Sequence, residues 1–172
     1  MDRRFEFTIR DAALEDAEEM ALAACSAWQF AYRGILDQTF IDSVAEPISF
    51  AERIRGAMSK DAHRLVAVSA NGEVIGFASE RRPCSLEGFD AEIAALYVDP
   101  TSSRSGIGGE LVREMVRRFL TDGRQSLAIH TLAENRIGSA FYEKMGGQPG
   151  PTTNWQGAPS KWYVWPDMSI LR

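Results

Sequence analysis

The sequence of 172 residues has few cysteines and no long apolar run. Its two cysteines, Cys25 and Cys84, lie far apart and lack CxxC or Cys/His spacing, which argues against a disulfide framework and a zinc site. We predict no bound metal. No segment has the apolar length that a signal peptide or a membrane span needs. We therefore expect a cytoplasmic protein with no membrane partner.

Positive charge is also scarce. The chain has 19 Lys and Arg against 24 Asp and Glu, which gives a net charge of −5. Proteins that bind nucleic acid obtain most of their affinity from Lys and Arg contacts to phosphate. The negative balance therefore argues against a nucleic-acid partner, and the same sign argues against an anionic membrane surface.

The length and the apolar content are typical of one globular domain. A chain of this size with 45% hydrophobic residues can build a single core, and no repeat or long linker divides it. We expect one domain over residues 1–172.

The hydrophobic pattern alternates between strand and helix periodicity. Strands are expected at 5–10, at 91–98, at 126–132, in two runs of 64–79 joined by a type I′ turn at Asn71-Gly72, and in two runs within 152–165. Helices are expected at 14–28, 38–58 with a break near Pro47, 107–119 and 136–145. The pattern predicts a mixed α/β fold, with 91–98 and 126–132 parallel across a helical crossover.

Three glycines lie close together at the junction between an expected strand and an expected helix. Gly106, Gly108 and Gly109 follow the apolar strand and open a helical pattern. Unpaired N–H groups at such a place converge, and the helix dipole adds positive potential, so the junction predicts a phosphate site. A Walker loop is excluded because no Lys-Ser/Thr pair follows the glycines, and a dinucleotide fingerprint would need glycine where Leu111 stands.

This junction resembles the cofactor motif of the GNAT family of N-acetyltransferases. Val98, Pro100, Gly106 and Gly108 match V-x-P-x-x-Q/R-x-x-G-x-G/A in register, and "NRIGSAFYEKMGG" resembles the companion motif of the family. Ser103 departs from the usual Gln or Arg. The resemblance is strongest over residues 90–147. It implies a central twisted mixed β-sheet flanked by helices on both faces, and acetyl-coenzyme A (acetyl-CoA) as cofactor.

The resemblance also implies which residues bind the cofactor. The loop N–H groups would hold its pyrophosphate, and a bulge would free the strand backbone for its pantetheine amides. The residues implied are Leu96, Tyr97, Val98, Ser103, Arg104, Ser105, Gly106, Ile107, Gly108, Gly109, Asn135, Ala140 and Tyr142.

For catalysis, the resemblance points to two residues. Tyr142 would be the general acid beside the thioester sulfur, and Glu92, fourteen residues before Gly106, would be the general base and contact the acceptor. Trp28 and Tyr32 fall where the family lines the acceptor pocket, although aromatic residues at helical spacing also pack cores. His130 has no partner visible in the sequence and is expected to be structural.

The function implied is transfer of the acetyl group to a primary amine by direct attack in a ternary complex. The alternative is an acyl-CoA binding or sensing module without turnover. The partner would be a small-molecule or peptide amine. Acidic residues near the acceptor side suggest that this amine is cationic; they are Asp37, Asp42, Glu46, Glu80, Glu87 and Asp90. The family often dimerises through its last strands, so a homodimer is an open alternative to a monomer.

Overall fold

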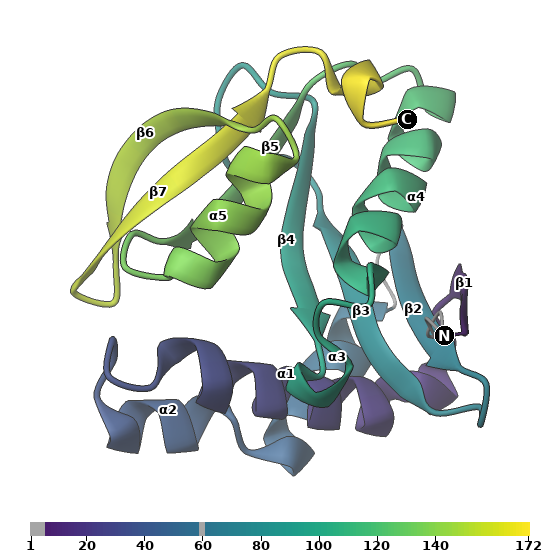
Figure 1. Cartoon of the computed structure of the whole chain (residues 1–172), viewed down its shortest axis with the longest axis vertical. Helices are drawn as coiled ribbons and strands as arrows, with labels where there is room; N and C mark the ends of the chain where they lie inside the picture. Colours follow the sequence, from purple (N-terminus) through teal and green to yellow (C-terminus); the bar gives the residue numbers. More distant parts are fainter. Residues whose placement is uncertain (1–5, 59–60) are drawn as a thin grey trace, which may run out of the picture.

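A computed structural model describes residues 6–58 and 61–172 (Figure 1). Its strands form one seven-stranded sheet in the order β1-β2-β3-β4-β5-β7-β6. Their bounds are β1 Phe7–Asp11, β2 Arg64–Ser69, β3 Val74–Arg81, β4 Ala91–Val98, β5 Leu127–Leu132, β6 Gln148–Trp155 and β7 Ala158–Trp165. The pair β4–β5 is parallel, as predicted, and the other pairs are antiparallel. Phe5, expected in the first strand, lies outside the described residues.

The helices cover both faces of this sheet, which confirms the predicted fold class. They are α1 Ala17–Tyr32, α2 Gln38–Val44, α3 Pro47–Met58, α4 Ile107–Thr121 and α5 Arg136–Lys144, with short 3-10 turns at Leu14–Asp16, Pro100–Ser102 and Met168–Leu171. Pro47 begins α3, because a first-turn proline needs no N–H partner, so the expected break falls between α2 and α3. Gly146, with φ +80°, follows the end of α5 as predicted.

Among the described residues, two of the three apolar cores lie between the helices and the sheet, and the third is a small cluster of Ala128, Trp162 and Val164. Met115, Phe119 and their neighbours on α4 pack with Tyr163 and Trp165 of β7 against one face. Met20 of α1 and its neighbours pack with α3 against the other face. In the described part of the chain, no helix is long and apolar enough to cross a membrane.

The β2–β3 hairpin forms at the predicted place with a different turn. Gly72 has φ +88°, but Asn71 is not among the residues with positive φ, so the type I′ prediction is wrong. The Gly72 N–H donates to the Ser69 carbonyl at 2.9 Å, and the Ser69 N–H donates to the Glu73 carbonyl at 2.9 Å. These bonds describe a three-residue loop, in which only its last residue needs the left-handed conformation.

A bulge in β4 sets the geometry of the site. Ser79 pairs with Ala95 while Glu80 pairs with Ile93, so Ala94 is the extra residue. The bulge places Ile93, Leu96 and Val98 against the core that contains α4, and Ala95 and Tyr97 against the core that contains α1. Beyond Ile93, which pairs with Ile129, β4 and β5 diverge (Figure 1).

Candidate active site

The loop between β4 and α4 has two residues in the left-handed region. Arg104 has φ +64° and Gly106 has φ +88°. Alternating left-handed residues turn successive N–H groups toward one side and form an anion-binding nest. The first N–H groups of α4 also lack helical acceptors, since the earliest helical bond runs from the Glu110 N–H to the Gly106 carbonyl. The sequence did not predict the strained conformation of Arg104.

Local contacts fix this loop at both ends. The Asp99 carboxylate accepts the Thr101 N–H at 2.8 Å, and the Ser105 hydroxyl donates to the Ser102 carbonyl. Gly108 faces α5, because a Cβ added there would lie 3.4 Å from the Phe141 ring. A side-chain methyl group at Gly108 would therefore make ordinary van der Waals contact with the Phe141 ring.

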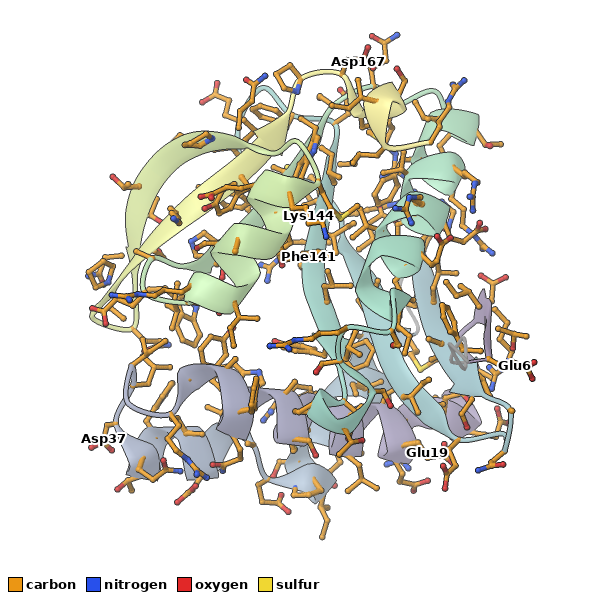
Figure 2. All side chains as sticks on the ribbon, viewed as in Figure 1. Glu6, Glu19, Asp37, Phe141, Lys144 and Asp167 are labelled. Atoms are coloured by element: carbon orange, nitrogen blue, oxygen red, sulfur yellow. The ribbon has the colours of Figure 1, made fainter. Side chains whose placement is uncertain are left out.

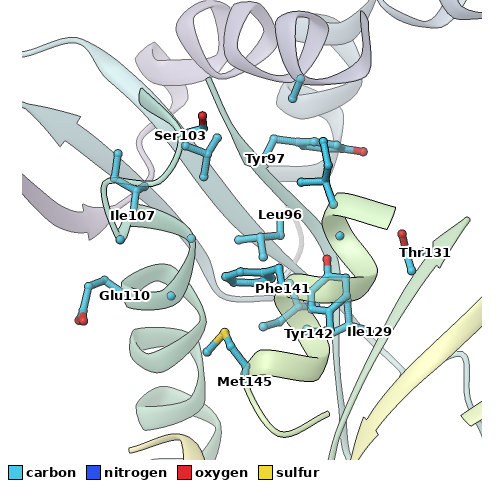
Figure 3. Close-up of a pocket in the computed structure, with 18 of the residues that line it drawn as sticks. Leu96, Tyr97, Ser103, Ile107, Glu110, Ile129, Thr131, Phe141, Tyr142 and Met145 are labelled. Carbon is cyan, nitrogen blue, oxygen red and sulfur yellow. The ribbon is translucent and has the colours of Figure 1, made fainter. Parts of the chain in front are cut away.

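The loop opens into a cleft of about 1660 Å³ that runs into the gap between β4 and β5. Figure 3 shows Leu96, Ile107, Phe141 and Tyr142 around this space. Thirteen of the predicted site residues line it: Tyr32, Leu96, Tyr97, Val98, Ser103, Arg104, Ser105, Gly106, Ile107, Gly108, Gly109, Asn135 and Tyr142.

Three predicted residues do not line the cleft. Ala140 is exposed on α5. Trp28 is 7% exposed, and its Nε1 donates to the Tyr97 hydroxyl at 3.0 Å. Glu92 is 3% exposed, accepts the Ser85 N–H at 2.7 Å and lies 3.4 Å from the Arg81 guanidinium. Glu92 therefore anchors the loop that follows β3.

Tyr142 lies between the diverging strands. In Figure 3 it stands between Leu96 of β4 and Ile129 of β5. Its ring packs 5.4 Å from Tyr163 and 6.4 Å from Trp165, centroid to centroid. Burial, with smaller contributions from Tyr97 and Tyr163, raises the pKa of the Tyr142 hydroxyl well above its usual value. The hydroxyl therefore keeps its proton at neutral pH.

Asn135 both caps a helix and lines the cleft. Its Oδ1 accepts the Gly138 N–H at 3.0 Å at the start of α5, and its Nδ2 lies 3.3 Å from the Thr131 hydroxyl. The cap fixes the orientation of the amide beside the cleft.

The structure gathers cationic side chains that sequence reasoning did not connect. Arg104, Arg113, Lys144 and Arg172 line the cleft, with Glu110 as the acidic residue among its lining. Lys144 and Phe141 lie on the side of α5 that faces α4 (Figure 2). A chain of net charge −5 thus places positive charge beside the nest. Lys144 follows Tyr142 by two residues in the companion motif, and this spacing is the signal that could have identified it.

The acidic residues expected near the acceptor have other partners. Asp37 accepts the Phe40 N–H at the start of α2, and Glu46 accepts the Ser49 N–H at the start of α3. Asp42 accepts from Gln29 and Gln38, and Asp90 accepts the Gln125 and Ser126 N–H groups. None of the six acids lines the cleft among the described residues. They therefore give no support for a cationic acceptor.

Comparison with known proteins agrees with this architecture. The model of the acetyltransferase (GNAT) family matches residues 22–147. An uncharacterised N-acetyltransferase of Bacillus subtilis, YuaI, is 26% identical over 170 residues, which are 96% of each chain. A spermidine N(1)-acetyltransferase of Thermoplasma acidophilum is 24% identical over 142 residues, which are 80% of this chain and 86% of that protein.

Solved structures share the fold. The PaiA N-acetyltransferase of Thermoplasma acidophilum, in complex with coenzyme A, superposes with a TM-score of 0.77 at 22% identity, over 93% of this chain and 99% of that chain. YncA of Salmonella typhimurium, a putative acetyltransferase with acetyl-CoA, gives 0.70 at 17% identity, over 93% of each chain. From the extent of the family match and the loop that opens α4, the chain belongs to the GNAT family and is an acetyl-CoA-dependent N-acetyltransferase.

Proposed function

We propose that this enzyme transfers the acetyl group of acetyl-CoA to a primary amine by direct attack while both substrates are bound. The observation that carries this proposal is the single cleft that joins the nest at Arg104–Gly106 to the gap between β4 and β5, where Tyr142 lies. Acetyl-CoA would supply the acetyl thioester and leave as a thiol.

The residues of the cleft fit this cofactor. The N–H groups of the nest and of the first turn of α4 would hold the pyrophosphate. Arg104 and Lys144, which line the same cleft, would bind its remaining phosphate charge, a role that Ser103 cannot fill because it has no charge. The backbone of Leu96 and Val98, beyond the last β4–β5 pair, would hydrogen-bond the pantetheine arm.

Tyr142 would donate the proton that the leaving thiolate needs. The raised pKa of the Tyr142 hydroxyl keeps it protonated at neutral pH, but it also makes this group a weaker acid than a free thiol, whose pKa is about 8.5. Donation to the sulfur would therefore be coupled to return of a proton from the attacking amine to Tyr142. The acetyl oxygen gains negative charge during attack, and a backbone N–H at the β4 bulge around Ala94 would stabilise it.

The cysteines support direct transfer over a covalent intermediate. Burial raises the pKa of both Cys25 and Cys84, which disfavours the thiolate. Neither residue is among those that line the cleft in the described part of the chain. Direct attack by the amine on the thioester therefore needs no acetylated cysteine intermediate.

The amine acceptor is best sought with a panel. Tyr32 of α1 lines the acceptor end of the cleft, and Trp28 packs 4.7 Å behind it, ring centroid to ring centroid. An aromatic wall suits an alkylamine. Because one relative is named a spermidine N(1)-acetyltransferase, polyamines head the panel, followed by aminoglycosides and peptides with free amino groups.

The test is release of free thiol from acetyl-CoA in the presence of each amine, with the acetylated product identified by mass. We expect at least one amine to give turnover, and acetyl-CoA alone to raise the melting temperature. A melting-temperature shift without thiol release from any amine would favour the binding module. No shift at millimolar acetyl-CoA would contradict the proposed cofactor site.

A further inference from the structure

His130 occupies a distinctive position in the sheet. Ile129 makes the last pair between β5 and β4, so His130 is the first residue of β5 beyond the point where the two strands separate. Ala94, the bulge residue of β4, is the corresponding first residue on the other strand. His130 and Ala94 both line the cleft, together with Tyr142.

The imidazole of His130 is held on one side only. Its Nε2 lies 3.0 Å from the Ser160 hydroxyl and 3.1 Å from the Thr153 hydroxyl, and those hydroxyls lie 2.8 Å apart. Ser160 is fully buried, and the imidazole ring packs against Trp162 with the ring centroids 4.7 Å apart and the planes tilted by 44°. Across the described residues, Nδ1 has no hydrogen-bond partner. The hydroxyls engage Nε2 and fix the ring, which leaves Nδ1 as the nitrogen without a partner in a residue that lines the cleft.

The surroundings keep this imidazole neutral. Burial lowers the pKa of the His130 imidazole, and Arg81 of β3 lowers it further. The Glu92 carboxylate of β4 raises it, but the net pKa lies below the ordinary value for histidine. The contacts from β6 and β7 are the uncharged groups of Thr153, Ser160 and Trp162. A neutral imidazole at pH 7 can accept a proton.

Acetylation of an amine requires such an acceptor. Alkylammonium groups have a pKa of about 10, so most of the substrate arrives protonated and cannot attack. Glu92 is enclosed by the loop that it anchors, and burial raises the pKa of the Tyr32 and Tyr97 hydroxyls, so at neutral pH they hold their protons. Glu110, the acidic residue that lines the cleft, pairs with Arg113 beside the nest. Among the histidine and tyrosine side chains that line the cleft, His130 therefore offers an unprotonated nitrogen without a hydrogen-bond partner in the described residues.

We propose that His130 is the general base of this enzyme and accepts the proton of the acceptor ammonium at Nδ1, directly or through one water. The inference rests on the proposed function. One proton passes from the ammonium to Nδ1, which leaves a neutral amine and an imidazolium that later releases the proton to solvent. The amine forms the C–N bond as the C–S bond breaks, Tyr142 gives its proton to the sulfur, and the second amine proton restores Tyr142.

The first test needs no substrate. The chain has two histidines, so nitrogen NMR of the wild-type protein labelled at histidine resolves both imidazoles, and H63Q assigns them. We expect His130 to be neutral at pH 7 with the proton on Nε2 and a pKa below that of free histidine. A proton on Nδ1 at pH 7, or an imidazolium at that pH, would overturn the proposal.

The second test is the pH profile of kcat/KM for the acceptor. The wild-type rate should fall on the acidic side with the NMR pKa of His130. At pH 7, the kcat/KM of H130Q should be lower than that of the wild type by about 100-fold or more. Its pH profile should lack the acidic limb set by His130, and its kcat/KM should instead rise tenfold per pH unit as the free amine becomes abundant. H63Q, which removes the 2.8 Å contact of His63 Nε2 with the Asp122 carboxylate outside the cleft, should keep the wild-type profile.

The outcomes separate the two proposals. An H130Q enzyme that keeps the wild-type rate and acidic limb would contradict the role of His130 while leaving the acetyltransfer intact. Thiol release from no amine by the wild-type enzyme would instead contradict the proposed function, and the tautomer measurement would then still decide whether Nδ1 is free to act. An unchanged melting-temperature shift with acetyl-CoA shows that H130Q is folded and binds the cofactor.

Discussion

Buried acidic side chains in this protein contact backbone and arginine groups. Glu80 is 4% exposed and accepts the His63 N–H at 2.8 Å, and Glu92 is 3% exposed and accepts the Ser85 N–H at 2.7 Å. Both carboxylates also lie beside arginine guanidinium groups, as buried charges require. Their contacts hold loops to the sheet, whereas Tyr142 and His130 line the cleft at the end where we propose that the reaction takes place.

At the same scale, Y142F tests the general acid. We expect kcat to fall by about 100-fold while the KM for acetyl-CoA changes less than threefold, because the hydroxyl acts when the thiolate leaves. Steady-state kinetics with the acceptor found in the panel measures both constants.

Y163F is the matched control for that experiment. Its hydroxyl donates to the Glu143 carboxylate at 2.7 Å, and its ring contacts Tyr142 in the same core. We expect it to lower stability but to keep most of kcat. Equal loss of kcat in the two variants would indicate that Tyr142 acts by packing rather than by proton donation.

Among the elements, the joint between β4 and α4 forms the proposed cofactor site, and its shape depends on two residues of left-handed conformation. A side chain at such a φ costs about 1–2 kcal/mol of strain. Arg104 bears that strain, and Gly106 avoids it. The strain at Arg104 is typical of a ligand site, where the backbone is held in the conformation that binding needs.

A pair of alanine substitutions separates strain from function. Gly106 and Gly72 both have φ +88°, and a Cβ at either would meet no atom within 4 Å. G106A and G72A should therefore lose similar stability, about 1 kcal/mol each. We expect only G106A to weaken acetyl-CoA binding, by tenfold or more, as measured by calorimetry. Equal affinities in the two variants would place the phosphate site elsewhere.

Ion pairs of a buried carboxylate stabilise the whole molecule in addition to its apolar cores. Glu80 of β3 contacts three segments: the one before β2 through the His63 N–H, the loop after β3 through Arg82, and the segment between α4 and β5 through Arg124. Burial alone would raise the pKa of Glu80, but hydrogen bonds from these groups outweigh it and lower the pKa below its ordinary 4.5.

The stability of the whole fold should therefore depend on acid. A carboxylate whose pKa is lower in the folded state stabilises the fold above its unfolded pKa, and that stabilisation is lost as pH falls through the folded pKa. We expect the melting temperature to decline as the pH falls below about 4.5. E80Q should lower the free energy of unfolding by about 2–4 kcal/mol at pH 7, because Arg124 loses its buried partner. The stability of E80Q should also decline less in acid than that of the wild type. Denaturant unfolding of E80Q and of the wild type at pH 7 and pH 4 measures both differences.

Much of the fold could be predicted from local patterns. The β2–β3 hairpin, the crossover from β4 to β5 and the glycine end of α5 follow from periodicity and turn residues. The turn at Asn71 was predicted wrongly, because an Asn-Gly pair fits more than one loop and the hydrogen bonds of Ser69 select between them. Local sequence also located the nest, since glycine spacing determines which backbone conformations are open.

What the sequence by itself determined is the order of the elements, the place of the proposed phosphate-binding loop and the family resemblance, because each depends on neighbouring residues. Only the tertiary structure decided which side chains share the cleft. The bulge at Ala94 and the separation of β4 from β5 brought His130 to the cleft while contacts to Ser85 and Arg81 engaged Glu92. Those contacts join residues far apart along the chain or on different strands, and no local periodicity encodes them.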